Sequence, residues 1–413
     1  MKIPKGNAGR LMLTHLFFLT VTGVHGYGAE QDAVWISNNI QARHMPYGTI
    51  IDPVFATPAS EEIVGYSRGG NSAIWTGHYL AAEAFRYRVT GSPEAFDNLR
   101  RALNGIRSLV DITGTDLLAR CLIPTDSPYA HAITTEEAGH GIFTGTMGAK
   151  SYYWIGNTVR DEYTGIFFGL GVAYDFVEDP EVRSAIRELV TRLLDFLLRN
   201  DWAVAMPDGG ITTVFWVRPD QQLSSLQVGR QVNPDRFDST YRKYRFWHAA
   251  SVVAPISYDV VDDHNSYFKF NLNTITLYNL IRLEDSSFYR SVYMKAYDIM
   301  RRTTDDHGNA HFNMIDRALT GTTSRDAETR NLLEDWLRRS RRDEWVDWRG
   351  DARYPACGED RACDPVSIVD RVRTDFLWQR SPFLLYGGGQ GLIEGPGIDY
   401  ILPYWMARYY GVL

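Results

Sequence analysis

The cluster Arg160-Asp161-Glu162-Tyr163 stands directly before a segment whose apolar pattern predicts a buried helix. An aspartate at a helix start can accept hydrogen bonds from free backbone N–H groups, and the positive end of the helix dipole favours its charge. Held there by Arg160, Asp161 could also serve as a catalytic acid or base, with Tyr163 beside it. An aspartate that only caps the helix would give the same pattern, so both interpretations stand.

A second cluster, at residues 262–269, precedes another aromatic helix. His264, Asn265 and Tyr267 supply an imidazole, an amide and a phenol within two helical turns. Histidine titrates nearest neutral pH and is therefore a candidate proton donor or acceptor. The alternative is a helix cap followed by solvated polar groups.

The third cluster is a glycine-rich turn at residues 387–397, with five glycines among residues 387–395. Glu394 lies between Ile393 and Gly395-Pro396, which suits a carboxylate held in a fixed position. No Gly-Lys-Ser/Thr follows, so the turn does not match a phosphate-binding loop. A tight loop that only packs on the fold is the alternative.

Aromatic residues make up 13% of the chain, and they could provide flat binding surfaces. Trp75 and His78 lie on the first predicted inner helix, and Trp247 lies on the third. A histidine on an apolar helix is more often a core residue, and abundant aromatic rings also fit a large helical core.

Several classes of chemistry are excluded or lack support. The net charge of −7 without a basic run argues against a nucleic-acid partner. His307 and His311 have a zincin-like spacing, but Gly308 intervenes and no glutamate follows His307, so we expect no catalytic metal and no cofactor. No Gly-x-Ser-x-Gly motif occurs, and Cys121 lies in an apolar stretch.

The elements that must position these clusters are helices of two alternating kinds. Residues 163–177 carry no charge before Asp175, whereas residues 182–197 place their apolar side chains on a single stripe. A helix that is apolar on all sides is buried, and a helix with one apolar stripe lies on the surface. Residues 71–89 and 92–113 repeat this pairing.

Further helices and loops are predicted along the rest of the chain. We expect an inner helix at 245–261, then helices at 265–283, 286–302, 327–339 and 398–410. Residues 115–160 and 201–238 look irregular, with short strands at 152–155 and 211–217.

Helical hairpins separated by long loops resemble the (α/α) toroids of the six-hairpin glycosidase-like superfamily. The resemblance covers residues 71–413 and is one of architecture, without a family signature that would transfer catalytic residues. It implies an all-α fold of the (α/α)6 type, with an inner and an outer ring of helices and a few short strands in long loops. A cleft at one end of the inner ring would take a carbohydrate, and the number of hairpins (five, six or seven) stays open.

The N-terminal residues 1–28 are typical of a signal peptide. Lys2, Lys5 and Arg10 precede a 14-residue apolar stretch, which is within the ~7–15 of a signal and short of the ~20 of a membrane span. We therefore expect export to a periplasm or the cell exterior, with an uncleaved anchor as the alternative. An irregular lead-in at 29–70 and a single toroid domain at 71–413 follow. Cys357 and Cys363 have a spacing that a local disulfide could close.

Three functions fit these residues. The first is a glycoside hydrolase of a poly- or oligosaccharide, in which Asp161 and Glu394 act as acid and as base or nucleophile, and Trp75, Tyr163 and Trp247 stack on sugars. The second is a polysaccharide lyase or sugar epimerase that removes a proton beside a carboxylate, using Arg160, Tyr163, His264, Asn265 and Tyr267. The third is a non-catalytic envelope protein that binds a glycan or a partner. The sequence leaves the sugar, the linkage and the oligomeric state open.

Overall fold

The computed structural model describes residues 27–261, 264, 266–374 and 376–413 of the 413-residue chain. The apolar stretch of the predicted signal and the predicted site residue Asn265 lie outside these residues. Within them, no helix is long and apolar enough to cross a membrane.

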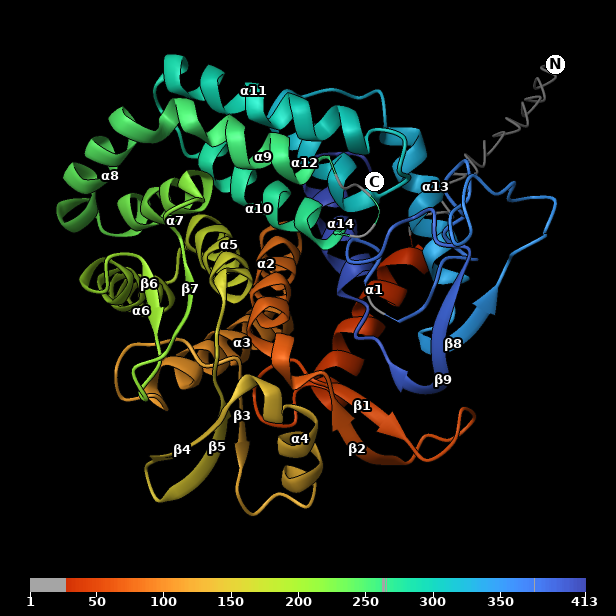
Figure 1. The fold of residues 1–413 in the computed structure, drawn as a ribbon, viewed down its shortest axis with the longest axis horizontal. Helices are drawn as coiled ribbons and strands as arrows, with labels where there is room; N and C mark the ends of the chain where they lie inside the picture. Colours follow the sequence, from red (N-terminus) through yellow and green to blue (C-terminus); the bar gives the residue numbers. More distant parts are fainter. Residues whose placement is uncertain (1–26, 262–263, 265, 375) are drawn as a thin grey trace, which may run out of the picture.

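Six helices of the described chain form a closed inner ring (Figure 1). Each contacts the next, and the last returns to the first. In ring order they are α2 (Ser72–Thr90), α5 (Arg160–Phe176), α7 (Pro219–Val232), α10 (Phe268–Arg282), α12 (Ala310–Thr320) and α14 (Ile398–Tyr409).

A second set of six helices covers the ring from outside, and each member contacts the inner helix with which it pairs. Taken in the same order, starting beside α2, they are α3 (Pro93–Asp111), α6 (Pro180–Arg199), α8 (Pro234–His248), α11 (Ser287–Thr304), α13 (Asp326–Leu337) and α1 (Tyr27–Asn39). The contacts confirm the expected (α/α)6 toroid and fix the number of inner–outer pairs in the described chain at six.

The outer helices begin where the sequence predicts. The Asp179 carboxylate accepts a hydrogen bond from the backbone N–H of Val182 at 2.9 Å, and Pro180 occupies the first turn of α6. Ser92 caps α3 in the same way, through the N–H of Ala95. Such caps satisfy N–H groups that the helix itself leaves unpaired.

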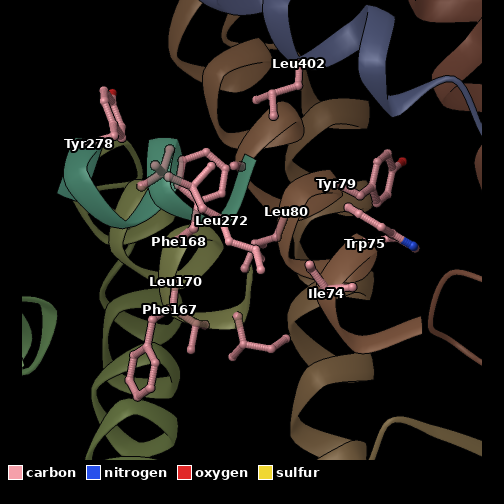
Figure 2. Close-up of a cluster of buried hydrophobic side chains, with 14 of the residues drawn as sticks. Ile74, Trp75, Tyr79, Leu80, Phe167, Phe168, Leu170, Leu272, Tyr278 and Leu402 are labelled. Atoms are coloured by element: carbon pink, nitrogen blue, oxygen red, sulfur yellow. The ribbon is translucent and has the colours of Figure 1, made fainter. Parts of the chain in front are cut away.

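The apolar side chains of neighbouring inner helices meet in the middle of the ring. Figure 2 shows Leu80 of α2, Phe168 of α5 and Leu272 of α10 converging on one another. These residues belong to one continuous core cluster that extends through the toroid.

Short strands occupy the loops that precede four of the inner helices. A four-stranded sheet has the order β2-β1-β9-β8, a three-stranded sheet the order β3-β5-β4, and a pair joins β6 to β7. Their bounds are β1 (Asp52–Phe55), β2 (Ile63–Ser67), β3 (Cys121–Pro124), β4 (Ile142–Met147), β5 (Lys150–Ile155), β6 (Ala203–Ala205), β7 (Ile211–Val214), β8 (Arg342–Asp347) and β9 (Tyr386–Glu394). Two short helices, α4 (Ala130–Glu136) and α9 (Val253–Asp259), complete the loops. Strands β5 and β7 confirm the two that the sequence predicts.

The predicted inner helix at 245–261 is wrong. This stretch contains the end of α8, a short 3-10 turn and α9, and the inner helix is α7, inside the segment 201–238 that looks irregular in sequence. Helix α7 is buried, yet it has no apolar pattern because polar side chains fill its buried surface: Asp220, Gln221, Gln222, Ser224, Ser225 and Gln227.

Two loop assignments also change. The lead-in at 29–70 contains helix α1, and the glycine-rich turn is largely strand β9. Gly388 has a φ of +127°, and a Cβ there would lie 2.1 Å from the carbonyl oxygen of Glu344, so only glycine fits this part of the strand pair. The sequence leaves open whether Cys357 and Cys363 are bonded, and in the structure they form a disulfide, whereas Cys121 is a buried thiol.

Candidate active site

A cavity of about 590 Å³ opens at the N-terminal ends of α5, α7 and α10. This volume lies within the range of roughly 300–1,000 Å³ that is typical of ligand sites. Polar and charged residues at these helix starts, in β7 and in α9 line the cavity: Arg160, Asp161, Thr213, Arg218, Gln221, Asp259 and Lys269.

Asp161 lines this cavity, and its neighbour Glu162 serves as the helix cap. The Glu162 carboxylate accepts hydrogen bonds from the N–H of Val159 at 2.9 Å and from Arg120 at 2.6 Å. The Asp161 carboxylate accepts no hydrogen bond and forms no ion pair within the described part of the chain. The sequence leaves open whether Asp161 is a cap, and the structure assigns that role to Glu162.

Burial raises the pKa of Asp161 above its ordinary value. The guanidinium groups of Arg160, Arg120 and Arg218 oppose this shift, and the charge of Asp259 adds to it. A carboxyl group with a raised pKa retains its proton to higher pH, which is the property required of a general acid.

One wall of the cavity holds a second carboxylate, which is fixed by two cations. The Arg218 guanidinium donates to Asp259 Oδ2 at 2.7 Å, and Lys269 Nζ lies 3.7 Å from Asp259 Oδ1. Asn273 adds a third donor, at 3.2 Å. These contacts orient the Asp259 carboxylate beside the cavity.

Arg218 is itself anchored on both sides. It donates to the two carboxylate oxygens of Asp220 at 3.0 and 2.6 Å and to Asn273 Oδ1 at 2.6 Å. Burial opposes its charge, but the carboxylates of Asp220 and Asp259 outweigh burial and raise its pKa. The guanidinium is therefore a permanent cation of this wall.

Exposed aromatic side chains stand at the rim. Tyr258 is 75% exposed and Phe268 is 39% exposed, and both line the cavity. Trp216, which adjoins the lining residue Val217, is exposed as well. A polar cavity edged by accessible rings can bind a ligand that has both hydroxyl groups and apolar faces.

Of the predicted site residues that the structure describes, Arg160 and Asp161 alone line this cavity. Arg160 donates to the carbonyl oxygen of Val214 at 2.8 Å, and burial together with the neighbouring Arg218 lowers its pKa. Tyr163 is fully buried in the core, where its hydroxyl accepts from the N–H of Leu118. It therefore presents no surface to a substrate.

Phe268 and Lys269 of the second predicted cluster line the cavity, whereas His264 and Tyr267 do not. His264 Nδ1 lies 2.8 Å from Ser381 Oγ and its Nε2 lies 3.3 Å from Asp360 Oδ2, so the imidazole joins the loop before α10 to the segment between β8 and β9. Tyr267 is buried, with its ring 5.6 Å from that of His307.

Glu394 is part of a separate ionic network at the end of β9. It accepts from Asn39 at 2.8 Å and from His44 at 3.4 Å, and Arg341 and Arg342 each lie 3.5 Å away. It does not line the cavity of Asp161. The predicted pairing of Asp161 with Glu394 is therefore not assembled, and Asp259 is the second carboxylate that lines this cavity.

The remaining predicted residues are also dispersed. His78 is fully buried at the ring centre, where its Nδ1 lies 2.8 Å from the Ile74 carbonyl oxygen, and burial lowers its pKa to about 4. Trp75 is buried against Phe376, with ring centroids 4.5 Å apart. Trp247 is 68% exposed near the end of the outer helix α8.

The functional residues that the sequence did not reveal are Arg218, Asp220 and Asp259. Arg218-Pro219-Asp220 is a helix start with proline in the first turn, which is the available signal. It was not recognised because α7 lacks an apolar pattern. Among the described residues no group of three or more His, Cys, Asp or Glu side chains is arranged to hold a metal ion.

Comparisons with known proteins give a distant structural likeness only. No family model matches the sequence, and no curated protein matches it. A solved structure, cellobiose 2-epimerase from Spirochaeta thermophila, aligns with 94% of this chain and 98% of its own, at 9% identity and a TM-score of 0.41. The (α/α)6 architecture itself follows from the closed series of helix contacts in this chain.

Proposed function

We propose that this chain is an exported carbohydrate-active enzyme that hydrolyses glycosidic bonds in the cavity between Asp161 and Asp259. The supporting observation is a pair of carboxyl groups in opposite environments on one cavity. Burial favours the protonated form of Asp161, whereas two cations hold the Asp259 carboxylate. Glycosidases use such a pair, one group as acid and one as base or nucleophile.

In this mechanism the Asp161 carboxyl transfers its proton to the glycosidic oxygen as the bond from that oxygen to the anomeric carbon breaks. The Asp259 carboxylate either removes a proton from the attacking water or attacks the anomeric carbon itself. Gln221 and Thr213 offer hydrogen-bonding groups for sugar hydroxyls. The exposed rings of Tyr258 and Phe268 offer stacking surfaces at the rim.

The test is reducing-sugar release from a panel of neutral and acidic polysaccharides by the wild type and by Asp161→Asn and Asp259→Asn. Loss of a general acid or base typically costs 10²–10⁴ in rate, so we expect kcat to fall at least about 100-fold in each variant. Asp126→Asn, at an exposed loop position, is the matched control and should retain wild-type activity.

The pH profile supplies an independent readout. Since Asp161 must carry its proton, the rate should decline on the alkaline side as pH passes its raised pKa, and Asp161→Asn should lose this limb. Full activity in both asparagine variants would refute the assignment. A product that absorbs in the near ultraviolet would indicate elimination instead of hydrolysis, and saturable glycan binding without turnover would indicate a binding protein.

A further inference from the structure

A second, smaller cavity lies at the N-terminal ends of α2 and α14, and it shares no lining residue with the candidate active site. Its volume is about 50 Å³. A cavity needs roughly 10–15 Å³ to hold one water molecule, so this space accommodates a few waters or one small polyatomic group. Its charged lining residues are Asp52, Arg68, Arg339, Arg341, Arg373 and Asp399, and we call it the arginine pocket.

Among the lining residues that the structure describes, guanidinium groups outnumber carboxylates, four to two. Arg68 is paired with Asp52 at 3.2 Å. Burial raises the pKa of Asp399, whose Oδ2 accepts from the N–H of Leu377 at 3.0 Å, so the negative charge of this carboxyl is disfavoured. Within the described lining, the positive charge of Arg339, Arg341 and Arg373 therefore exceeds the negative charge of the carboxylates.

One of these three arginines, Arg339, is held by neutral acceptors. Arg339 donates to the carbonyl oxygens of Ile368, Arg371 and Val372, at 3.2, 2.8 and 2.6 Å. Burial, with the neighbouring arginines, lowers its pKa to about 10, which still leaves it charged at neutral pH.

The other two arginines, Arg341 and Arg373, each have a carboxylate partner outside the pocket lining. Arg341 donates to the carbonyl oxygens of Gly395 and Pro396 and lies 3.5 Å from Glu394. Arg373 pairs with Glu344, which does not line the pocket.

Buried donors of the pocket residues lack acceptors. Arg341 Nη1, Arg373 Nε and the Thr374 hydroxyl are buried and have no hydrogen-bond partner within the described chain. Leaving a buried donor unpaired costs about 1–3 kcal/mol, and more for a charged group, so native proteins rarely do so without a bound group. These three donors belong to residues that line one cavity, where a bound acceptor could pair with them.

The backbone around the arginine pocket also favours an anion. The pocket is bounded by Gly395-Pro396-Gly397, directly before α14, and by Asn71, directly before α2. The N-terminal ends of both helices carry partial positive charge and favour anions.

From the unpaired donors, the excess of guanidinium groups and the two helix ends, we propose that the arginine pocket binds a small oxyanion, either a carboxylate or a phosphate group. Guanidinium groups bind both with short, charge-assisted hydrogen bonds. The aromatic rings of Trp75 and Phe376 are among the lining groups, so an oxyanion attached to a sugar ring would find an aromatic surface beside it.

The experiment measures binding to the full chain by titration calorimetry and thermal melting at fixed ionic strength. The probes are sodium phosphate, acetate, glucuronate and glucose 1-phosphate, with glucose and sodium chloride as controls. We expect saturable binding and a raised Tm with at least one oxyanion and with neither control. Preference for glucuronate over acetate would identify an acidic sugar as the source, and preference for free phosphate an inorganic anion.

Variants of the lining residues test whether the oxyanion binds in the arginine pocket. Arg373→Gln and Thr374→Val each remove one unpaired donor and should weaken binding by about tenfold, since a charged hydrogen bond contributes that order of affinity. Arg338→Gln, which removes an exposed charge on the neighbouring helix end, should leave binding unchanged. Arg341 is left unchanged, because it also holds the loop before α14 and its substitution would affect that loop as well as binding.

Two outcomes would overturn the inference. One is the absence of saturable binding by every oxyanion, and the other is equal weakening by Arg338→Gln, which would indicate a diffuse charge effect. Asp161→Asn should bind the oxyanion with wild-type affinity, so failure of the proposed hydrolase activity and failure of this pocket are distinguishable.

Discussion

Asp161 and Glu394 show how differently two carboxyl groups behave in one fold. Asp161 is partly buried and has no hydrogen-bonding partner within the described chain, and desolvation raises its pKa. Burial also opposes the charge of Glu394, but the hydrogen bond from His44, the charge of Arg341 and the amide of Asn39 outweigh it and lower its pKa to about 2. The first environment suits proton donation, and the second suits a permanent anion that ties β9 to α1.

The Glu394 network predicts an acid-sensitive contribution to stability. The pKa of Glu394 falls from an ordinary 4.5 to about 2 on folding, so its contribution is complete above pH 4.5 and is lost as pH falls towards 2. At 1.36 kcal/mol per pKa unit this contribution amounts to about 3 kcal/mol.

Urea unfolding of the wild type and of Glu394→Gln between pH 7 and pH 2.5 measures the contribution of Glu394 to stability. The difference in unfolding free energy between the two proteins should shrink as pH falls. A difference that is constant with pH would contradict the assignment of Glu394 to this network.

At the scale of elements, the contact between α2 and α5 depends on glycine. A Cβ added at Gly77 would lie 2.1 Å from the carbonyl oxygen of Gly165, and one added at Gly169 would lie 2.2 Å from that of Gly77. The two backbones therefore touch, and this close approach holds the start of α5, with Asp161, next to its neighbours in the ring.

We expect Gly77→Ala to destabilise the protein by more than the ~1–3 kcal/mol typical of overpacked side chains, because the clash is with backbone that cannot rotate away. Gly139→Ala is the matched control, since a Cβ there meets no atom within 4 Å. Chemical denaturation midpoints would show the effect. Equal midpoints for Gly77→Ala and the wild type would mean that the helices are not in this contact in solution.

At the scale of the whole molecule, α14 closes the toroid. It lies between α12 and α2, and α1 covers it from outside (Figure 1). Arg408 of α14 pairs with Glu30 of α1, so the two ends of the described chain meet. Trp405 is fully buried in α14 at this closure, and the guanidinium of Arg86 lies 5.9 Å from its ring.

Trp405→Ala should cost about 3–5 kcal/mol of stability, as truncation of a fully buried tryptophan does. Trp247→Ala removes the same side chain from an exposed position and should change stability by no more than about 0.5 kcal/mol. Thermal or urea unfolding of the two variants tests this comparison. A small effect of Trp405→Ala would show that the fold does not depend on closure at α14.

The sequence by itself determined the elements whose signals are local. The hairpins α2–α3 and α5–α6 and the pair α10–α11 follow from apolar periodicity and from caps such as Asp179, which act within a few residues. The placement of Arg160 and Asp161 at the entrance of an inner helix follows from the same patterns. The disulfide between Cys357 and Cys363 is likewise a short-range feature.

Only the tertiary structure decided which residues share a site. Helix α7 has no apolar stripe because its buried surface is polar, and the contacts that satisfy it, such as Arg218 with Asp259, come from other segments. The apolar periodicity of a segment gives no information about contacts with residues that are distant in sequence. For the same reason the sequence could not show that Glu394 belongs to a different network from Asp161, or that Trp247 points away from the ring into solvent.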